Sequence, residues 1–518
     1  MTREQERTEL HKIIWRIAND LRGSVDGWDF KSYVLGMLFY RFISEDITRY
    51  ANKLVSDSGD DDSSFNYETL PDEDAENGRA QMVEEKGYFI LPSELFANVQ
   101  KNAAKDENLN ITLANIFHNI ENSANGTASE PDMQGLFSDI DTNSKKLGNT
   151  VAQRNEKLVK ILNAIAELNL GTTFDQTTND TFGDAYEFLM TMYASNAGKS
   201  GGEFFTPQEV SRLLVMIVIG HKGRLRKVYD PACGSGSLLL QFKKLMGNNC
   251  PPMFGQEINP TTYNLCRINM FLHGVGFDKF DIQLGDTLLD PKHWDDEPFD
   301  GIVSNPPYST KWEGKSNPLL INDPRFSPAG VLAPESKADL AFTMHMLSWL
   351  STDGTAAIVE FPGVLYRGGA EEKIRNYLIS NNFVDTVIQL PENLFFGVTI
   401  ATCIIVLKKS KADSNILFVD ASKEFIHEGN KNKLSEENIT HIYNAVDKRE
   451  PVKHLCALVS NDDVISNGSN LSVSSYVEPE DTTEKVDIKE LNEQIAEIVK
   501  KEAELRAAID KIVAELSA

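Results

Sequence analysis

The fold of this chain is decided by the stretch Val228-Tyr229-Asp230-Pro231-Ala232-Cys233-Gly234-Ser235-Gly236-Ser237, which precedes the helical run Leu238 to Met246. This order predicts a short strand, a tight glycine-rich turn and a helix. Small residues allow the backbone to approach a ligand, and amides at a helix N-terminus favour its anionic group, here a carboxylate. Tight turns often use glycine without any ligand, so the stretch alone is a weak indication of a binding site.

Acidic residues follow the next two strands that the pattern predicts. Phe254-Gly255-Gln256-Glu257 ends a second short strand, and Ile282 to Asp286 ends a third. Glu257 can accept both hydroxyls of a ribose, Asp286 can bond an adenine amino group, and Asp230 can hold the turn or a ligand ammonium. Each carboxylate by itself fits a strand-end cap or a solvated side chain equally well. Together, at the carboxyl edge of an α/β sheet, they predict a nucleoside cofactor site.

The tetrapeptide Asn305-Pro306-Pro307-Tyr308 directly follows the apolar run Phe299 to Ser304. The exocyclic nitrogen of adenine is a poor nucleophile because its lone pair is delocalised into the ring. Asn305 offers a side-chain oxygen and Pro306 a backbone carbonyl to its two N–H groups, while the prolines keep these acceptors rigid. Tyr308 can then stack on the base. The four residues alone also fit a proline-rich turn after a strand.

A further segment, Gly201-Gly202-Glu203-Phe204-Phe205-Thr206-Pro207-Gln208, lies upstream. Thr206 before Pro207 predicts a helix N-cap with proline at the first helical position. Two aromatic residues and a carboxylate before the cap are not needed for capping, and they suit a surface that binds adenosine.

In this order, Gly-Glu-Phe-Phe-Thr-Pro, Asp-Pro-Ala-Cys-Gly-Ser-Gly and Asn-Pro-Pro-Tyr resemble the motifs of N6-adenine DNA methyltransferases that use S-adenosylmethionine. Over nearly its whole length the chain resembles the modification subunit of a type I restriction-modification system. That resemblance includes Leu10 to Glu45 with Asp26-Gly27-Trp28-Asp29-Phe30, the approach Gly198-Lys199-Ser200-Gly201-Gly202, and Asn470-Leu471-Ser472 before a terminal helix. Cys233 stands where many relatives have a second alanine, which is a small change.

The resemblance implies an α/β fold with a doubly wound, Rossmann-like methyltransferase sheet of strand order 3-2-1-4-5-7-6, an N-terminal all-helical domain and a C-terminal helix. It implies the catalytic residues Asn305, Pro306, Pro307 and Tyr308. The implied residues for S-adenosyl-L-methionine are Glu203, Phe204, Phe205, Thr206, Pro207, Gln208, Asp230, Gly234, Ser235, Gly236, Ser237, Glu257 and Asp286. The implied partners are a specificity subunit, a second modification subunit, a restriction subunit and double-stranded DNA.

Periodicity divides the chain into three predicted domains. Residues 1–170 show helical spacing, residues 171–478 alternate helices with short strands, and residues 479–518 form a terminal helix. Beyond Asn305 the strands are expected at Thr355 to Glu360, Val384 to Gln389 and Ala401 to Leu407, whereas residues 421–478 show no clear pattern. The terminal helix carries apolar residues at a 3-4 spacing, which favours a partner helix, although packing on its own domain remains open.

The segment Ser309 to Lys337 has no regular periodicity, and long loops of this kind are usually functional or disordered. Its basic and aromatic residues predict a flap that faces DNA, with a mobile surface loop as the alternative. These residues are Lys311, Trp312, Lys315, Arg325 and Phe326.

Net charge is −26 and the isoelectric point is near 4.8, so the isolated chain repels DNA at long range. Part of the acidity lies in Asp57 to Asp62 and Asp72 to Glu85, which we expect to be a solvated loop or an insertion away from the DNA face. In the family that the chain resembles, a separate specificity subunit reads the DNA sequence. An acidic modification subunit is therefore compatible with a DNA substrate.

Other features exclude several classes of protein. The five cysteines show no paired spacing, which favours a reducing cytoplasm. The charged segment Met1 to His11 is not a signal peptide, and the longest apolar runs are too short for a membrane span. The nine histidines are scattered, so we expect no metal site.

The expected reaction is methyl transfer from S-adenosylmethionine to N6 of a flipped adenine. Two alternatives remain open. A protein-glutamine N5 methyltransferase would present a similar amide group to the same motif, and a non-catalytic assembly scaffold would bind the cofactor only to shape a complex.

Overall fold

The computed structural model describes residues 29–57, 65–168, 183, 186–190, 206–395, 397–429, 431–479 and 488–516. Two compact units are present, Met1–Val477 and Glu478–Ala518. Among the described residues, no helix is long and apolar enough to cross a membrane.

The first described region is helical, as predicted. Its α-helices are α2 (Asp29–Asp57), α3 (Asp72–Ala75), α4 (Arg79–Lys86), α5 (Phe96–Asn102), α6 (Leu109–Asn122), α7 (Glu130–Met133) and α8 (Val151–Ala166). Helix α2 packs against α5 and α8 with a continuous run of buried residues from Val34 to Tyr40. Thr150 starts α8 through a capping box with Gln153. The acidic stretch 72–85 forms helices α3 and α4 rather than the predicted loop, and residues 58–64 lie outside the description.

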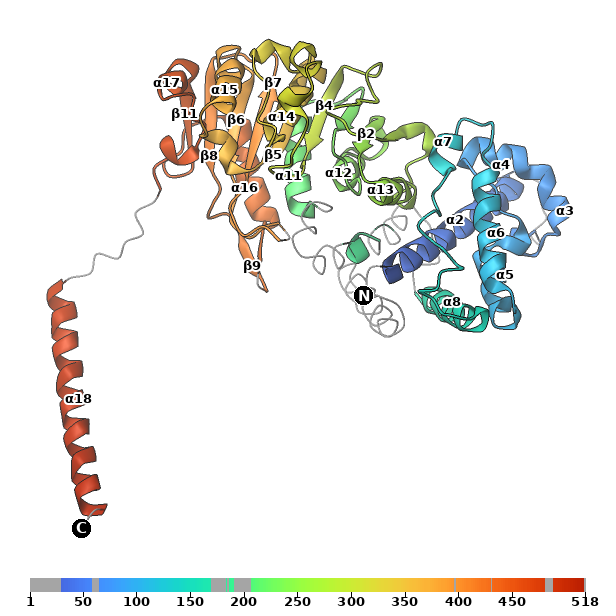
Figure 1. The fold of residues 1–518 in the computed structure, drawn as a ribbon, viewed down its shortest axis with the longest axis horizontal. Coiled ribbons are helices and arrows are strands. Elements are labelled where there is room, and N and C mark those ends of the chain that lie inside the picture. Colours follow the sequence, from blue (N-terminus) through green and yellow to red (C-terminus); the bar gives the residue numbers. More distant parts are fainter. Residues whose placement is uncertain are drawn as a thin grey trace. The chain divides into compact units, whose positions relative to one another are not determined.

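A nine-stranded sheet forms the second region, in the order β11-β8-β6-β7-β5-β4-β1-β2-β3 (Figure 1). Its strands are β1 (Val228–Asp230), β2 (Met253–Glu257), β3 (Phe280–Leu284), β4 (Phe299–Ser304), β5 (Leu350–Glu360), β6 (Val384–Gln389), β7 (Cys403–Lys408), β8 (Asn415–Asp420) and β11 (Cys456–Ser460). The predicted order 3-2-1-4-5-7-6 is confirmed. Strands β8 and β11 extend the sheet beyond β6, and β9 (Ile426–Glu428) pairs with β10 (Lys431–Lys433) separately.

Helices cover both faces of this sheet. They are α11 (Gln208–Ile219), α12 (Ser237–Met246), α13 (Pro260–Leu272), α14 (Asp339–Trp349), α15 (Ala370–Ser380), α16 (Glu436–Lys448) and α17 (Asn461–Ser466). Neighbouring residues of one strand belong to different cores: Val303 and Val359 pack in the core that contains α11 and α12, whereas Ile302 and Ile358 pack in the core that contains α14 and α15. This alternation follows from the two-residue period of a strand, and it explains why β4 is buried throughout.

The helical region is joined to the sheet region through α13. The buried Arg267 donates hydrogen bonds from Nη1 to the carbonyl oxygens of Pro131, Asp132 and Gln134. The ring of Phe39 on α2 lies 6.2 Å from that of Phe271. Three carbonyl acceptors at one guanidinium make this a specific junction, because a buried arginine needs partners for its donors.

Helix α18 (Ile488–Leu516) belongs to the second unit and has 29 residues. Apolar side chains that are at least 46% exposed recur along it at the predicted 3-4 spacing; they include Leu491, Ile495, Ile498, Leu505, Ile509, Ile512 and Leu516.

Candidate functional site

The carboxyl ends of parallel strands β1, β2, β3, β4 and β5 meet at one edge of the sheet. Asp230 ends β1 and is fully buried. Its Oδ1 accepts hydrogen bonds from the Ala232 N–H (3.0 Å) and the Ser304 hydroxyl (2.9 Å), whereas Oδ2 has no hydrogen-bond partner among the described residues. Burial raises the pKa of Asp230 to about 7. Asp230 therefore ties the turn after β1 to the last residue of β4 and keeps one oxygen free for a ligand.

The turn after β1 requires glycine at two positions, by backbone conformation at Gly234 and also by lack of space at Gly236. Gly234 and Gly236 adopt left-handed conformations, with φ of 54° and 79°. A Cβ on Gly236 would lie 2.8 Å from the Cys266 sulfur. The buried hydroxyls of Ser235 and Ser237 lie 2.9 Å apart, and α12 begins at Ser237 without a side-chain cap. This geometry fits the predicted cradle for an anionic group.

Glu257, at the end of β2, is bound to this turn. Its Oε2 accepts the Gly234 N–H at 3.0 Å, and its Oε1 accepts the Asn259 N–H at 2.9 Å. Burial raises the pKa of Glu257. A carboxylate has about four lone-pair directions, so two remain for ribose hydroxyls. Glu257 thus acts as a strand-end cap and still fits the predicted cofactor role.

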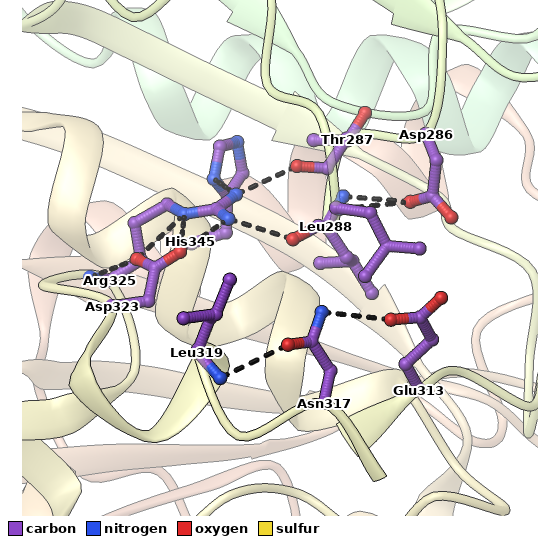
Figure 2. A network of polar contacts seen from close by, with 10 residues as sticks. Asp286, Thr287, Leu288, Glu313, Asn317, Leu319, Asp323, Arg325 and His345 are labelled. Carbon is purple, nitrogen blue, oxygen red and sulfur yellow. Dashed lines mark hydrogen bonds and ion pairs between the residues drawn. The ribbon is translucent and has the colours of Figure 1, made fainter. Parts of the chain in front are cut away.

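Asp286 starts the loop after β3, where its Oδ1 accepts the Leu288 N–H at 2.9 Å. Figure 2 shows Arg325 beside this loop, with dashed lines to Thr287 and Leu288. The Arg325 guanidinium donates to the carbonyls of Thr287 and Leu288, both at 2.7 Å, and lies 3.3 Å from Nδ1 of His345. His345 is fully buried on α14.

The prediction that Arg325 and Phe326 face DNA was wrong, because each residue is only 2% exposed. Arg325 instead pairs with Asp323 at 2.7 Å and fastens residues 309–338 to the Asp286 loop (Figure 2). Of the other predicted flap residues, Lys311 and Lys315 are exposed and Trp312 is half-buried. The segment contains three short 3-10 helices, Gly314–Ser316, Leu320–Asn322 and Ser327–Ala329, so it is not structureless.

Asn305 follows β4 and is hydrogen-bonded to two other residues of the predicted site. Its Nδ2 donates to the Thr206 hydroxyl at 3.0 Å, and its Oδ1 accepts the Tyr308 hydroxyl at 2.6 Å. Thr206 is not a helix cap, contrary to the prediction, because α11 begins at Gln208 with Pro207 at its N-cap position and no side-chain cap. The Thr206 hydroxyl instead accepts a hydrogen bond from Asn305 Nδ2, and this bond orients the Asn305 amide. The Tyr308 ring meets Phe395 edge-on at 6.4 Å between centroids.

Some predicted residues contribute differently or fall outside the description. Gln208 bonds Gln241 of α12. Pro306 is buried and Pro307 half-buried. Glu203, Phe204 and Phe205 lie outside the described residues. Three residues near Tyr308 were not predicted from the sequence: Phe395, Asp339 and Glu360. Glu360 ends β5, so the rule that polar residues at strand ends form the site would also have identified it.

Among the described residues, one histidine lies close to two carboxylates, and whether they bind a metal is not tested. Asp281, His293 and Asp296 place three possible ligand atoms within 4.8 Å of one another. His293 is buried, with Nδ1 3.2 Å from Asp296 and Nε2 2.9 Å from the Gly255 carbonyl oxygen. Both carboxylates are partly exposed, at 42% and 37%, and they serve as partners of this histidine without an ion.

The sheet order and the residues at its carboxyl edge define an S-adenosylmethionine-dependent methyltransferase. The model of the N-6 DNA Methylase family matches residues 177–485, and that of the HsdM N-terminal domain matches residues 10–165. This protein belongs to the N-6 DNA methylases, and within them to the methylase subunits of type I restriction enzymes. It is an adenine-specific DNA methyltransferase.

Individual relatives agree with this assignment. The chain is 46% identical to the type I restriction enzyme MpnII methylase subunit of Mycoplasma pneumoniae, over 99% of this chain and 97% of the relative. It is 30% identical to the MjaVII methylase subunit of Methanocaldococcus jannaschii, over 96% and 82%. The crystal structure of the type I restriction-modification methyltransferase subunit from Streptococcus thermophilus matches with a TM-score of 0.83 and 35% identity, over 91% of this chain and 100% of that chain.

Proposed function

We propose that this subunit methylates N6 of an adenine that is flipped out of double-stranded DNA, with Asn305, Pro306, Pro307 and Tyr308 as the catalytic residues. The observation that carries the proposal is the bond between Ser304 and Asp230, at 2.9 Å. It fastens the strand end that carries Asn305 to the turn expected to hold the cofactor. The acceptor for the adenine amino group and the cofactor turn therefore keep a constant spacing, which methyl transfer requires.

The cofactor residues fit S-adenosylmethionine on the geometry of the turn. Asp230 Oδ2 is a buried acceptor that no described residue hydrogen-bonds, which suits the ammonium of a methionine moiety. Gly234 and Gly236 leave the backbone bare for a carboxylate, and Glu257 keeps lone pairs for a ribose. When bound, the cofactor supplies an electrophilic methyl group on a positively charged sulfur.

The protein's own contribution is to orient the adenine amino group. Asn305 Oδ1 has two lone pairs, of which Tyr308 uses one, so an amino proton can take the other. The Pro306 carbonyl is assigned the second amino proton. Both bonds draw N–H electrons toward the nitrogen and aim its lone pair, which is electrostatic and positional catalysis.

The protein works in a complex with other subunits, and we propose which ones. A chain of net charge −26 needs a partner that supplies DNA contacts, and a specificity subunit that reads bases and phosphates meets that need. A second modification subunit and a restriction subunit complete the proposed assembly. The exposed apolar residues of α18 suit helices of the specificity subunit.

We also propose three domains, with boundaries near residues 170 and 478, and a cytoplasmic location. The five cysteines are all unpaired thiols, which suits a reducing compartment that contains DNA.

The test is methylation by the complex co-purified with its specificity subunit, using Asn305→Ala and, as a matched control, Asn102→Ala on the exposed side of α5. Wild type and Asn102→Ala should methylate adenine in DNA, and Asn305→Ala should not. Methyl transfer to glutamine of a release-factor-like protein, and none to DNA, would contradict the proposal and make the protein a glutamine N5 methyltransferase. No transfer to either would leave an assembly scaffold.

A further inference from the structure

Two carboxyl groups lie buried behind the Asn305–Tyr308 motif. Asp339 is the first residue of α14 and Glu360 is the last residue of β5; they are 1% and 0% exposed. Asp339 Oδ1 accepts the Ser309 N–H at 3.0 Å, and Glu360 Oε1 accepts the Thr343 hydroxyl at 2.8 Å. Within the part of the chain that the structure describes, the second oxygen of each, Asp339 Oδ2 and Glu360 Oε2, has no hydrogen-bond partner.

The bond from Ser309 to Asp339 supports a strained residue. Ser309 has a φ of 52°, in the left-handed region that residues other than glycine rarely adopt. Such a conformation persists only when its surroundings hold it. Ser309 directly follows Tyr308 in the chain. By holding Ser309, Asp339 therefore fixes the direction of the backbone at the end of the catalytic motif, and with it the direction of the Tyr308 side chain.

The charges around Glu360 decide its protonation state. Burial, followed by the negative charges of Asp339 and Glu371, raises the pKa of Glu360 well above its usual range. The groups that face it are Asp339 and Thr343 from α14, Glu371 from α15, Tyr308 from the motif and Cys403 from β7, and Arg367 pairs with Glu371 at 3.4 Å. Burial therefore favours the neutral acid form of Glu360 over its carboxylate. Asp339 lies in the first turn of α14, where the helix dipole favours a negative charge.

The two unpartnered oxygens complement each other in that state. A protonated Glu360 has an O–H that needs an acceptor, and Asp339 Oδ2 is an acceptor that needs a donor. Without this proton, two like charges would be buried together, which is costly.

We propose that Glu360 is a positioning residue, which in its protonated form donates a hydrogen bond to Asp339 and so holds the Ser309 turn that aims Tyr308 and Asn305. This inference rests on the proposed catalytic role of Asn305 and Tyr308. Without its proton, the negatively charged Glu360 would repel Asp339. The Ser309 turn would then lose its support and kcat would fall, while the cofactor turn would stay intact.

The experiment measures kcat and KM of the co-purified complex from weakly acidic to alkaline pH, for wild type, Glu360→Gln, Glu360→Ala and the exposed control Glu372→Gln on α15. Infrared difference spectra follow the protonated carboxyl group. We expect wild-type kcat to fall as the carboxylic-acid band disappears. Glu360→Gln, whose amide can still donate, should retain neutral kcat and lose that decline. Glu360→Ala should lower kcat roughly ten- to a hundredfold with KM for S-adenosylmethionine unchanged.

Three results would overturn the inference: an alkaline decline in Glu360→Gln that equals wild type, a wild-type kcat that stays constant while the acid band disappears, or wild-type kcat in Glu360→Ala. Glu360→Gln keeps the shape of the side chain, so the pH comparison does not depend on whether Glu360→Ala folds. Asn305→Ala, assayed in parallel, separates the two hypotheses. An active Asn305→Ala would refute the motif assignment, whereas an inactive one beside unaffected Glu360 variants would refute only the positioning role.

Discussion

The hydroxyl of Tyr308 donates a 2.6 Å hydrogen bond to Oδ1 of Asn305, the same oxygen that is assigned to the amino group of the target adenine. Burial raises the pKa of Tyr308 well above its usual range, so the phenol keeps its proton and remains a donor. The Asn305 Nδ2 is bound to Thr206 at the same time. The orientation of the amide is thus established before any base arrives, which lowers the cost of organising the site during the reaction.

Replacing Asn305 with alanine should lower kcat at least about a hundredfold, because a positioned transition-state contact is lost. S-adenosylmethionine should bind nearly as to wild type, since Asn305 contacts Thr206 and Tyr308 rather than the glycine turn. Calorimetry with the cofactor checks this. An equal loss of cofactor affinity would mean that Asn305 supports the cofactor site and not the base.

Tyr308→Ala should have a similar effect on kcat to that of Asn305→Ala, because both the stacking surface and the hydroxyl are removed, whereas Tyr308→Phe should retain most of the activity. Stacking of a base on an aromatic ring contributes about 1–3 kcal/mol, and phenylalanine preserves it. Single-turnover methylation of duplex DNA compares the two variants. A Tyr308→Phe variant as inactive as Tyr308→Ala would assign the essential role to the hydroxyl bond with Asn305.

Glu257→Ala should weaken S-adenosylmethionine binding by at least about tenfold, because hydrogen bonds to a charged group contribute roughly 1.5–3 kcal/mol. The substitution also leaves the Gly234 and Asn259 amides without their acceptor. Glu257→Gln, which retains one amide oxygen, is the intermediate control, and equilibrium dialysis measures both. Wild-type affinity in Glu257→Ala would reduce Glu257 to a strand-end cap.

Glu360→Gln should stabilise the protein at neutral pH. The pKa of Glu360 is raised in the folded state, so the folded protein binds a proton that the unfolded chain has lost above its ordinary pKa. Wild-type stability therefore falls as pH rises from that ordinary pKa toward the raised one, and a glutamine removes this contribution. Thermal unfolding at acidic and neutral pH should show a gain in Tm that grows with pH; a gain of equal size at both would contradict the linkage.

Removal of residues from 480 onward should abolish assembly with the specificity subunit and leave S-adenosylmethionine affinity unchanged. The truncation removes the exposed apolar residues of α18 that are proposed to contact the specificity subunit. The compact unit that ends at Val477 contains the described cofactor residues and is retained. Sedimentation of the truncated chain mixed with specificity subunit measures this. A complex as tight as that of the full-length chain would place the interface elsewhere.

Sequence patterns predicted several strands of the sheet and where the polar residues at their ends lie. Asp230, Glu257 and Asn305 each follow a strand, and the carboxyl ends of parallel strands must share one edge, so their meeting was predictable without coordinates. The strand order came from the family resemblance and is confirmed. Strands β8 and β11 were not predicted; β11 lies within residues 421–478, which show no clear two-residue period, and β8 ends directly before them.

Tertiary structure decided which side chains became partners. Thr206 bonds Asn305 instead of capping a helix, and Arg325 is buried under the Asp286 loop instead of facing DNA. Asp339 supports Ser309 across 30 positions of sequence. Strand and turn patterns are local, because they reflect backbone preferences and the alternation of neighbouring side chains. A hydrogen-bond partner is chosen by which donors and acceptors the packed chain encloses together, and no local pattern in the sequence records that choice.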